Sequence, residues 1–321
     1  MRSSNSEVFE VIEPGPLTTV QDPGRYGYQH YGVPVAGAMD GFALRVANFL
    51  AGNREDAACL EITLTGLKLR MLANTIIAVT GGDLAPRING DPLAMWQSVA
   101  VTKGDVISFA WARKGCRTYL SVAGGIDVPP VMGSRATYVK SGIGGFEGRA
   151  LKSGDRLKNG IFNQLRPGLK LPPEFTPLYK TSNTLRVILG PQDDYFTGEG
   201  IQTLLNSEYT ISNEADRVGY RLIGPVIKHK AGADIISDGI PMGAIQVPGS
   251  GLPIVLLADR QTTGGYPKIA TAVTVDIPRL AQAKPGDKLR LKSVTVSEAR
   301  VLLKEYEDML STIRELLLKG G

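Results

Sequence analysis

The chain is poor in the residues from which metal centres and disulfide frameworks are built. Its 321 residues include two cysteines, Cys59 and Cys116, and two histidines, His30 and His229. The cysteines lie far apart with no CxxC spacing, which argues against a tetrahedral zinc site and against a dense disulfide framework. We expect reduced thiols and a cytoplasmic location.

Long apolar runs and phosphate-binding loops are also missing. No apolar run approaches the roughly 18 residues of a membrane-spanning helix, and Glu7, Glu10 and Glu13 stand where a signal peptide is apolar. Neither GxxxxGKS, GxxxxGKT nor a GxGxxG motif between a strand and a helix occurs, so the chain encodes no conventional nucleotide cradle. The 36 basic and 31 acidic residues are interspersed. We therefore expect neither a nucleic acid nor a membrane as a partner.

Glycine and proline, in contrast, are abundant, at 38 and 20 residues. Short β-rich runs alternate with Gly, Pro or Asp, as in residues 75–84, 117–125 and 252–260. Such regular spacing is typical of barrels and sandwiches. We predict a mainly β protein with a few short helices.

Three segments share a turn signature, a Gly-Asp pair that leads into an alternating run: 102–109, 152–159 and 284–291. Glycine takes the positive φ that tight hairpin turns require. We predict three similar hairpins, two in the first half and one near the end. A weaker echo between 31–40 and 238–247 indicates two related halves, although chance recurrence in a glycine-rich chain explains it equally well.

The length corresponds to about two domains. We place the first β-barrel domain at 8–165 and the second, with a C-terminal helix, at 184–321. The segment between them, 166–183, holds several prolines and shows neither helical nor strand periodicity. It is therefore interpreted as a proline-rich linker.

Two helices are predicted from capping and periodicity. Asp40 is a natural N-cap for the amphipathic run that follows it. The second helix covers 297–318, with Ser297 as its N-cap and with Val296 and Val301 as a hydrophobic staple.

A polar, glycine-rich segment, 258–270, follows an apolar run and resembles a ligand-facing loop. Its candidate residues are Asp259, Arg260, Gln261, Thr263, Gly264, Gly265 and Tyr266. Just upstream, Asp238 and Gln246 can form a facing wall. The alternative is a polar hairpin turn, with ordinary turn elements in the upstream segment.

The first half has a long polar loop, 18–40, whose candidates include Asp22, Arg25 and His30. Structured loops of this length are usually functional. His30 has a pKa suited to general base work. Alternatively, the histidine has a structural role and Asp22 only forms a turn.

Two further segments have open interpretations. Residues 141–149 can bind an anion through backbone amides and Arg149, or form a flexible hairpin. Residues 212–225 place Arg217 and Arg221 beside acidic side chains, which suits either carboxylate binding or intramolecular salt bridges.

Taken together, six motifs resemble the family of the 5-oxoprolinase C subunit, which is also described as allophanate hydrolase subunit 2-like, as KipA-type, and as part of the carboxyltransferase domain of urea carboxylase. The motifs are residues 21–40, 117–137, 142–149, 190–196, 213–225 and 237–270. The resemblance extends from about Glu10 to Leu291.

The resemblance implies two tandem cyclophilin-like β-barrel domains and a role as one subunit of an ATP-dependent 5-oxoprolinase, inactive alone. Together with a KipI-like B subunit, and with an A subunit, such an enzyme opens the lactam of 5-oxo-L-proline to L-glutamate. ATP, with magnesium, would be shared with a partner subunit. The alternatives are a KipA-type regulator that binds a histidine kinase inhibitor, or the carboxyltransferase component of a urea carboxylase-like system.

The resemblance also suggests roles for residues. Charge on the lactam oxygen and the phosphoryl group would be stabilised by donors, and carboxylates can hold the magnesium ion. The catalytic candidates are Arg260, Gln261, Asp259, Asp238, Arg25 and Asp22. The candidates for cofactor binding are Thr263, Gly264, Gly265, Tyr266 and Gln246.

Overall fold

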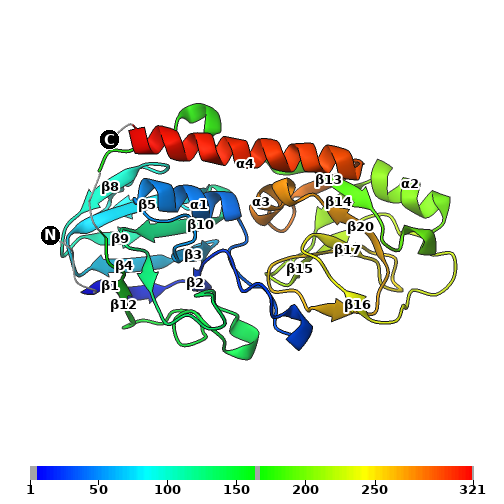
Figure 1. Cartoon of the computed structure of the whole chain (residues 1–321), viewed down its shortest axis with the longest axis horizontal. Helices are drawn as coiled ribbons and strands as arrows, with labels where there is room; N and C mark the ends of the chain where they lie inside the picture. The colour runs from blue at the N-terminus through cyan, green and yellow to red at the C-terminus, as the bar shows by residue number, and fades with distance from the viewer. Residues whose placement is uncertain (1–5, 163–166, 320–321) are drawn as a thin grey trace. The chain divides into compact units, whose positions relative to one another are not determined.

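The computed structural model describes residues 6–162 and 167–319, and the chain forms two compact units (Figure 1). Unit 1 comprises Met1–Arg25, Asp40–Tyr179 and Met309–Gly321, and unit 2 comprises Tyr26–Met39 and Lys180–Asp308. A short segment of the first half thus belongs to unit 2. The domain limits inferred from the sequence stay a prediction, and the boundary between residues 165 and 166 lies outside the described residues.

Unit 1 is built from two antiparallel sheets. The larger sheet has the order β11-β12-β1-β4-β9-β6-β7, with β1 Ser6–Pro14, β4 Leu67–Met71, β6 Arg87–Ile88, β7 Asp91–Pro92, β9 Val106–Ser108, β11 Ile126–Asp127 and β12 Arg156–Asn159. The smaller sheet has the order β2-β3-β10-β5-β8, with β2 Thr18–Gln21, β3 Cys59–Thr63, β5 Thr75–Asp83, β8 Ser98–Val101 and β10 Lys114–Val122. One apolar cluster contains residues of both sheets, among them Phe9, Leu69 and Leu120.

Helix α1, Gly41–Leu50, confirms the first helix prediction. The Asp40 carboxylate accepts a hydrogen bond from the Ala43 amide at 2.9 Å, which satisfies one of the free amides at the helix start. The Thr80 hydroxyl of β5 donates to the Ala43 carbonyl at 2.7 Å. The helix is thereby held against the smaller sheet.

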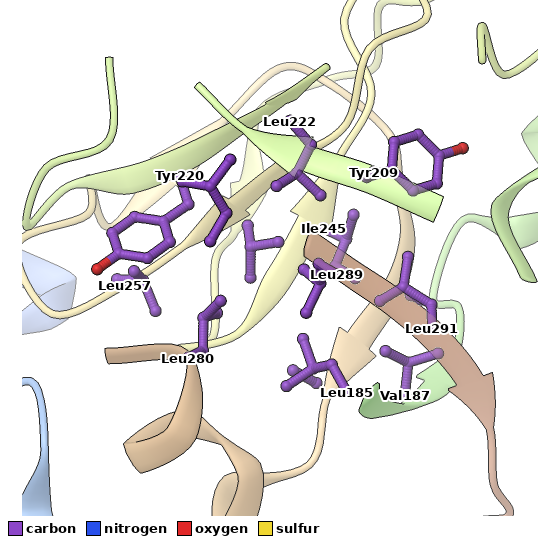
Figure 2. Packing of buried hydrophobic residues seen from close by; sticks show 14 of the residues in the cluster. Leu185, Val187, Tyr209, Tyr220, Leu222, Ile245, Leu257, Leu280, Leu289 and Leu291 are labelled. Atoms are coloured by element: carbon purple, nitrogen blue, oxygen red, sulfur yellow. The ribbon is translucent and has the colours of Figure 1, made fainter. Parts of the chain in front are cut away.

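Unit 2 is a closed barrel with the strand order β13-β20-β17-β18-β15-β14-β21 (Figure 1). Its strands are β13 Ser182–Leu189, β14 Glu208–Ile211, β15 Gly219–Ile223, β17 Ala244–Gln246, β18 Ile254–Leu256, β20 Lys268–Ala272 and β21 Lys288–Ser293. Figure 2 shows buried side chains from several of these strands, including Leu185, Tyr220 and Leu289, gathered in its core. Met39 belongs to the same cluster. The mainly β prediction is confirmed, with a closed barrel in this unit.

The remaining elements are short, apart from the last helix. They are β16 Asp238–Gly239, β19 Thr263–Gly264, α2 Gly198–Asn206, α3 Ile277–Ala281 and the 3-10 turns η1 Gln29–Tyr31, η2 Val139–Ser141, η3 Pro173–Phe175, η4 Asp193–Tyr195 and η5 Thr274–Asp276. Among the described residues, no helix is long and apolar enough to cross a membrane.

The three Gly-Asp turns exist, but the predicted hairpins are wrong. In each turn the aspartate carboxylate accepts from the backbone amide three residues earlier, as Asp105 does from Thr102 at 2.7 Å. Strand β9 follows its turn, yet it pairs with β4 and β6, while the preceding β8 pairs with β5. The turn therefore moves the chain from one sheet to the other.

The C-terminal helix α4 spans Val296–Lys319, close to the predicted 297–318, but its N-terminal details were wrong. Thr295 is the cap: its hydroxyl accepts from the Glu298 amide at 3.2 Å, while the Glu298 carboxylate accepts from the Thr295 amide at 2.7 Å. This reciprocal pair is a capping box. Val296 and Val301 are 51% and 57% exposed, so they form no staple.

Candidate active site

The loop that follows β18 places Arg260 inside unit 2 with neutral hydrogen-bond partners. The side chain is 7% exposed. Its Nε donates to the Ile240 carbonyl at 2.9 Å and its Nη1 to the Leu257 carbonyl at 3.1 Å. Burial lowers the pKa of this guanidinium, and Tyr26 partly opposes that effect. No carboxylate among the described residues forms an ion pair with it. A desolvated cation of this kind favours an incoming anion.

The neighbouring Asp259 is committed to an ion pair. Its carboxylate accepts from Arg217 Nε at 2.9 Å and from Arg217 Nη2 at 2.8 Å, and both residues are buried. Arg217 Nη2 also donates to the Gly37 carbonyl at 2.7 Å. Arg221, in contrast, pairs with Glu214 at 2.8 Å on the surface. The salt-bridge interpretation of segment 212–225 therefore holds for both arginines.

A cavity of about 910 Å³ in unit 2 gathers three predicted residues, Gln246, Gln261 and Tyr266. Gln246 Nε2 donates to the Tyr266 carbonyl at 3.0 Å. A Cβ on Gly264 would lie 2.7 Å from Ile240 Cδ1 and 2.9 Å from Gln246 Nε2. A larger residue at this position would therefore displace the side chains of Ile240 and Gln246. The cavity volume falls in the range of small-molecule sites.

Asp238, Thr263, Gly264 and Gly265 lie on or beside a two-stranded sheet at the same loop. Strands β16 and β19 pair Asp238 with Gly264 and Gly239 with Thr263, and the Gly265 carbonyl accepts from the Ile235 amide at 2.8 Å. The structure thus brings together nine of the predicted residues within one unit.

Sequence reasoning missed two residues of this cluster, Lys268 and Gln192. Lys268 Nζ donates to Asp238 Oδ2 at 2.8 Å, and Gln192 Nε2 donates to the same oxygen at 3.2 Å. These bonds lower the pKa of Asp238. Lys268 stands two residues after Tyr266, so the polar segment contained the signal, but a lysine there is normally expected on the surface.

Asp22 and Arg25 belong to unit 1 and hold its own loops. The Asp22 carboxylate accepts from the Ser134 hydroxyl at 2.7 Å and from the Arg135 amide at 2.5 Å. Arg25 Nε donates to the Val131 carbonyl at 2.9 Å and Nη2 to the Ala136 carbonyl at 2.8 Å. These contacts give both residues a structural role, and their catalytic role stays a prediction.

Two further predicted sites have other partners. His30 is exposed and packs against Tyr31, with ring centroids 3.8 Å apart and ring planes tilted by 44°. Arg149 forms ion pairs with Asp155 at 2.7 Å and with Glu147 at 2.6 Å. Its guanidinium is therefore already matched by carboxylates within the loop.

The three carboxylates considered for magnesium do not form a metal site. Asp22 accepts from Ser134 and Arg135, and Asp238 and Asp259 accept from Lys268 and Arg217 respectively. Across 6–162 and 167–319, no group of three acidic, histidine or cysteine side chains is arranged to hold a metal ion. These residues do not fit magnesium, and ATP with its metal stays a prediction.

Comparison with known proteins gives consistent matches. Residues 31–293 match the family described as the carboxyltransferase domain, subdomain A and B. The chain is 37% identical to the 5-oxoprolinase C subunit of Escherichia coli (strain K12), over 96% of this chain and 97% of that protein. It is 33% identical to the 5-oxoprolinase C subunit of Haemophilus influenzae, over 97% of this chain and 99% of the relative. The urea carboxylase of Kluyveromyces lactis superimposes with a TM-score of 0.91 at 32% identity, over 97% of this chain but 29% of that enzyme.

Proposed function

This chain belongs to the carboxyltransferase domain family of subdomains A and B, and we propose that it is the C subunit of an ATP-dependent 5-oxoprolinase. The complex would open the lactam of 5-oxo-L-proline to L-glutamate with ATP hydrolysis. Two relatives that are named as 5-oxoprolinase C subunits align over almost their full length. That end-to-end match supports the proposal.

The observation that carries the proposal is the buried Arg260. A lactam carbonyl is a poor electrophile, so phosphorylation of its oxygen by ATP would convert it into a leaving group. The lactam oxygen would attack the γ-phosphorus with release of ADP, and negative charge would be carried by the phosphoryl oxygens in that step. Water would then add to the activated carbon, the C–N bond would break with protonation of the nitrogen, and phosphate would be released. Arg260 has two nitrogens fixed by backbone carbonyls and, within the described part of the chain, no carboxylate partner. Its Nη2 group forms no hydrogen bond with the described residues and would be available to a phosphoryl oxygen.

The chain would act only with partner subunits. It has no phosphate-binding loop, and its three candidate carboxylates are engaged by donors of its own. We propose that ATP is shared with a KipI-like B subunit, which would supply the groups that hold its magnesium, while an A subunit is the third component of the enzyme. The chain alone would then be inactive.

The similarity to urea carboxylase supports one other candidate function. A TM-score of 0.91 favours a carboxyltransferase role, in which biotin would be presented by another polypeptide, since no AMKM-like carrier motif occurs in this chain. The chain spans 29% of that enzyme, whereas it spans 97% of the Escherichia coli relative. Transfer of carboxyl groups from carboxybiotin, without lactam cleavage, would favour this second candidate.

Replacement of Arg260 tests the proposed role of its guanidinium. In the reconstituted complex, Arg260→Ala is expected to lower turnover of 5-oxoproline by a factor of about 100 to 1,000, because one oxyanion donor is lost. Arg260→Lys keeps the charge but loses the planar fork, so its loss should be intermediate.

The matched control is Arg290→Ala, which removes an arginine whose side chain is 56% exposed. Melting temperature and complex formation are measured beside the rate. Wild-type turnover in Arg260→Ala, with assembly unchanged, would remove this loop from the mechanism.

A further inference from the structure

The carboxylate of Asp238 sits in a set of three donors from three separate segments. Lys268 Nζ lies 2.8 Å and Gln192 Nε2 lies 3.2 Å from its Oδ2, and the Gly239 amide donates to its Oδ1 at 2.7 Å. An ammonium and two N–H groups are donors of the kind that bind a carboxylate, and Lys268 and Gln192 contribute two of them from outside the segment of Asp238.

Lys268 and Gln192 are held rigidly beside each other. The Lys268 amide donates to Gln192 Oε1 at 3.1 Å, and the Gln192 amide donates to the Lys268 carbonyl at 3.1 Å. The amide side chain of Gln192 is therefore fixed at its oxygen, which directs its nitrogen at the carboxylate. This arrangement does not depend on Asp238.

The two halves of the ion pair differ sharply in burial. The Lys268 side chain is 1% exposed, whereas that of Asp238 is 53% exposed. A buried ammonium is costly, and an apolar side chain of similar volume is often no less stabilising than a buried pair. A buried lysine whose anion stands at the surface is thus poorly explained by stability alone.

Asp238 is also on an exposed segment, which is held by strand β16 and by backbone hydrogen bonds of Ile235 and Ile240. Residues 236–239 are all exposed, and Ile236 is 95% exposed. Strand β16 contains only two residues. The aspartate side chain is therefore on the solvent side of the pair, and a second carboxylate would have to replace it because a buried unpaired ammonium is costly.

The donors adjoin the candidate active site. Lys268 pairs with Gln246 across strands β17 and β20, and directly opposed residues of antiparallel strands lie on the same face. Gln246 lines the 910 Å³ cavity. Asp238 in turn pairs with Gly264, which packs against Gln246.

We propose that Lys268 and Gln192 form a carboxylate receptor, occupied here by the chain's own Asp238, which exchanges it for the carboxylate of the lactam substrate. The inference rests on the proposed function for the identity of the substrate. In this proposal Arg260 contacts the lactam oxygen of the substrate, and Lys268 contacts its carboxylate.

The first experiment compares two lactams in the reconstituted complex. 5-Oxoproline carries the carboxylate and 2-pyrrolidinone lacks it. Lys268→Met is expected to raise the KM for 5-oxoproline by a factor of about 10 to 100, because a charge-assisted hydrogen bond is lost, and to leave the inhibition constant of 2-pyrrolidinone unchanged. Asp238→Ala should lower that KM, since the competing carboxylate is gone. Lys228→Met is the control, because Lys228 forms an exposed pair with Glu199.

The second experiment needs no activity. In the full chain, Asp238→Ala empties the receptor, so acetate should raise its melting temperature more than acetamide or sodium chloride does at equal concentration. The wild type should show no such difference. This experiment also tests the proposed receptor if Lys268→Met does not fold.

Three results would each contradict the proposed receptor. They are an unchanged KM for 5-oxoproline in Lys268→Met, a raised KM in Asp238→Ala, and a melting temperature of Asp238→Ala that does not respond to acetate. A wild-type complex that does not consume 5-oxoproline would instead overturn the proposed function, while the acetate arm would still test the receptor.

Discussion

Two buried arginines of unit 2, Arg217 and Arg260, differ in their partners. Arg217 contacts both oxygens of Asp259, whereas the hydrogen bonds of Arg260 within residues 6–162 and 167–319 all go to backbone carbonyls. A paired buried cation fixes the local structure, because either charge alone would be costly. A cation with neutral partners remains able to bind an anion. The difference separates a structural arginine from the proposed functional one.

Asp259→Asn tests this assignment at the structural arginine. It should lower the free energy of unfolding by about 3–5 kcal/mol, because Arg217 would be left buried without its counter-charge. Chemical denaturation of the isolated chain measures the change. Glu214→Gln is the control, since its pair with Arg221 is exposed and should contribute less than about 1 kcal/mol. Equal small effects in both variants would contradict the structural role of Asp259.

Much of the site could be predicted at the residue level, with one consistent gap. The polar segment after β18 was identified from composition, because Asp, Arg, Gln and Tyr beside glycines are unusual at the end of a buried strand. Lys268 and Gln192 were missed. Whether this lysine is buried depends on strand register and on a carboxylate 30 positions away in the sequence. Neither can be recognised from the residues around the lysine. The ion pair of Asp259 was hidden for the same reason.

At the scale of elements, the Gly-Asp turn recurs with one geometry. Gly104, Gly154 and Gly286 have φ values of +100°, +87° and +90°. The aspartates that follow them accept from the amides of Thr102, Lys152 and Lys284 at 2.7, 2.7 and 3.0 Å. The sequence predicted the turn because it is local. It could not predict the sheet that each following strand joins, because that depends on distant partners.

Alanine substitutions test the shared turn. Gly104→Ala, Gly154→Ala and Gly286→Ala should each lower the free energy of unfolding by about 1–2 kcal/mol, because an L-residue is strained at positive φ. No atom lies within 4 Å of the added Cβ at any of the three positions, so strain is the expected cause. Gly198→Ala in helix α2 is the control, with equal space and no positive φ. Three unequal losses, or a similar loss in the control, would contradict a common geometry.

The helices show the same division between local and distant information. The Asp40 cap of α1 was predicted and confirmed, because capping involves residues close in sequence. For α4, Ser297 was preferred although Thr295 and Glu298 match the capping box. The predicted staple is wrong as well, because Val296 is 51% exposed.

At the scale of the whole molecule, composition and turn density predicted a mainly β chain, and the length predicted about two domains. They could not show that Tyr26–Met39 belongs to the second unit. Met39 packs in the barrel core, and the Ala36 amide donates to the Ala258 carbonyl at 3.1 Å. The segment has no strand or helix periodicity, so nothing in its sequence indicates the unit with which it packs.

The central claim is that this chain is one part of an ATP-dependent lactam hydrolase and acts only in its complex. The most direct test measures ATP hydrolysis and glutamate formation from 5-oxoproline by the purified chain, with and without the A and B partners. We predict no 5-oxoproline-dependent hydrolysis by the chain alone, and coupled hydrolysis with glutamate release in the reconstituted complex. ATP hydrolysis stimulated by 5-oxoproline in the chain alone, or a fully assembled complex that forms no glutamate, would contradict the account.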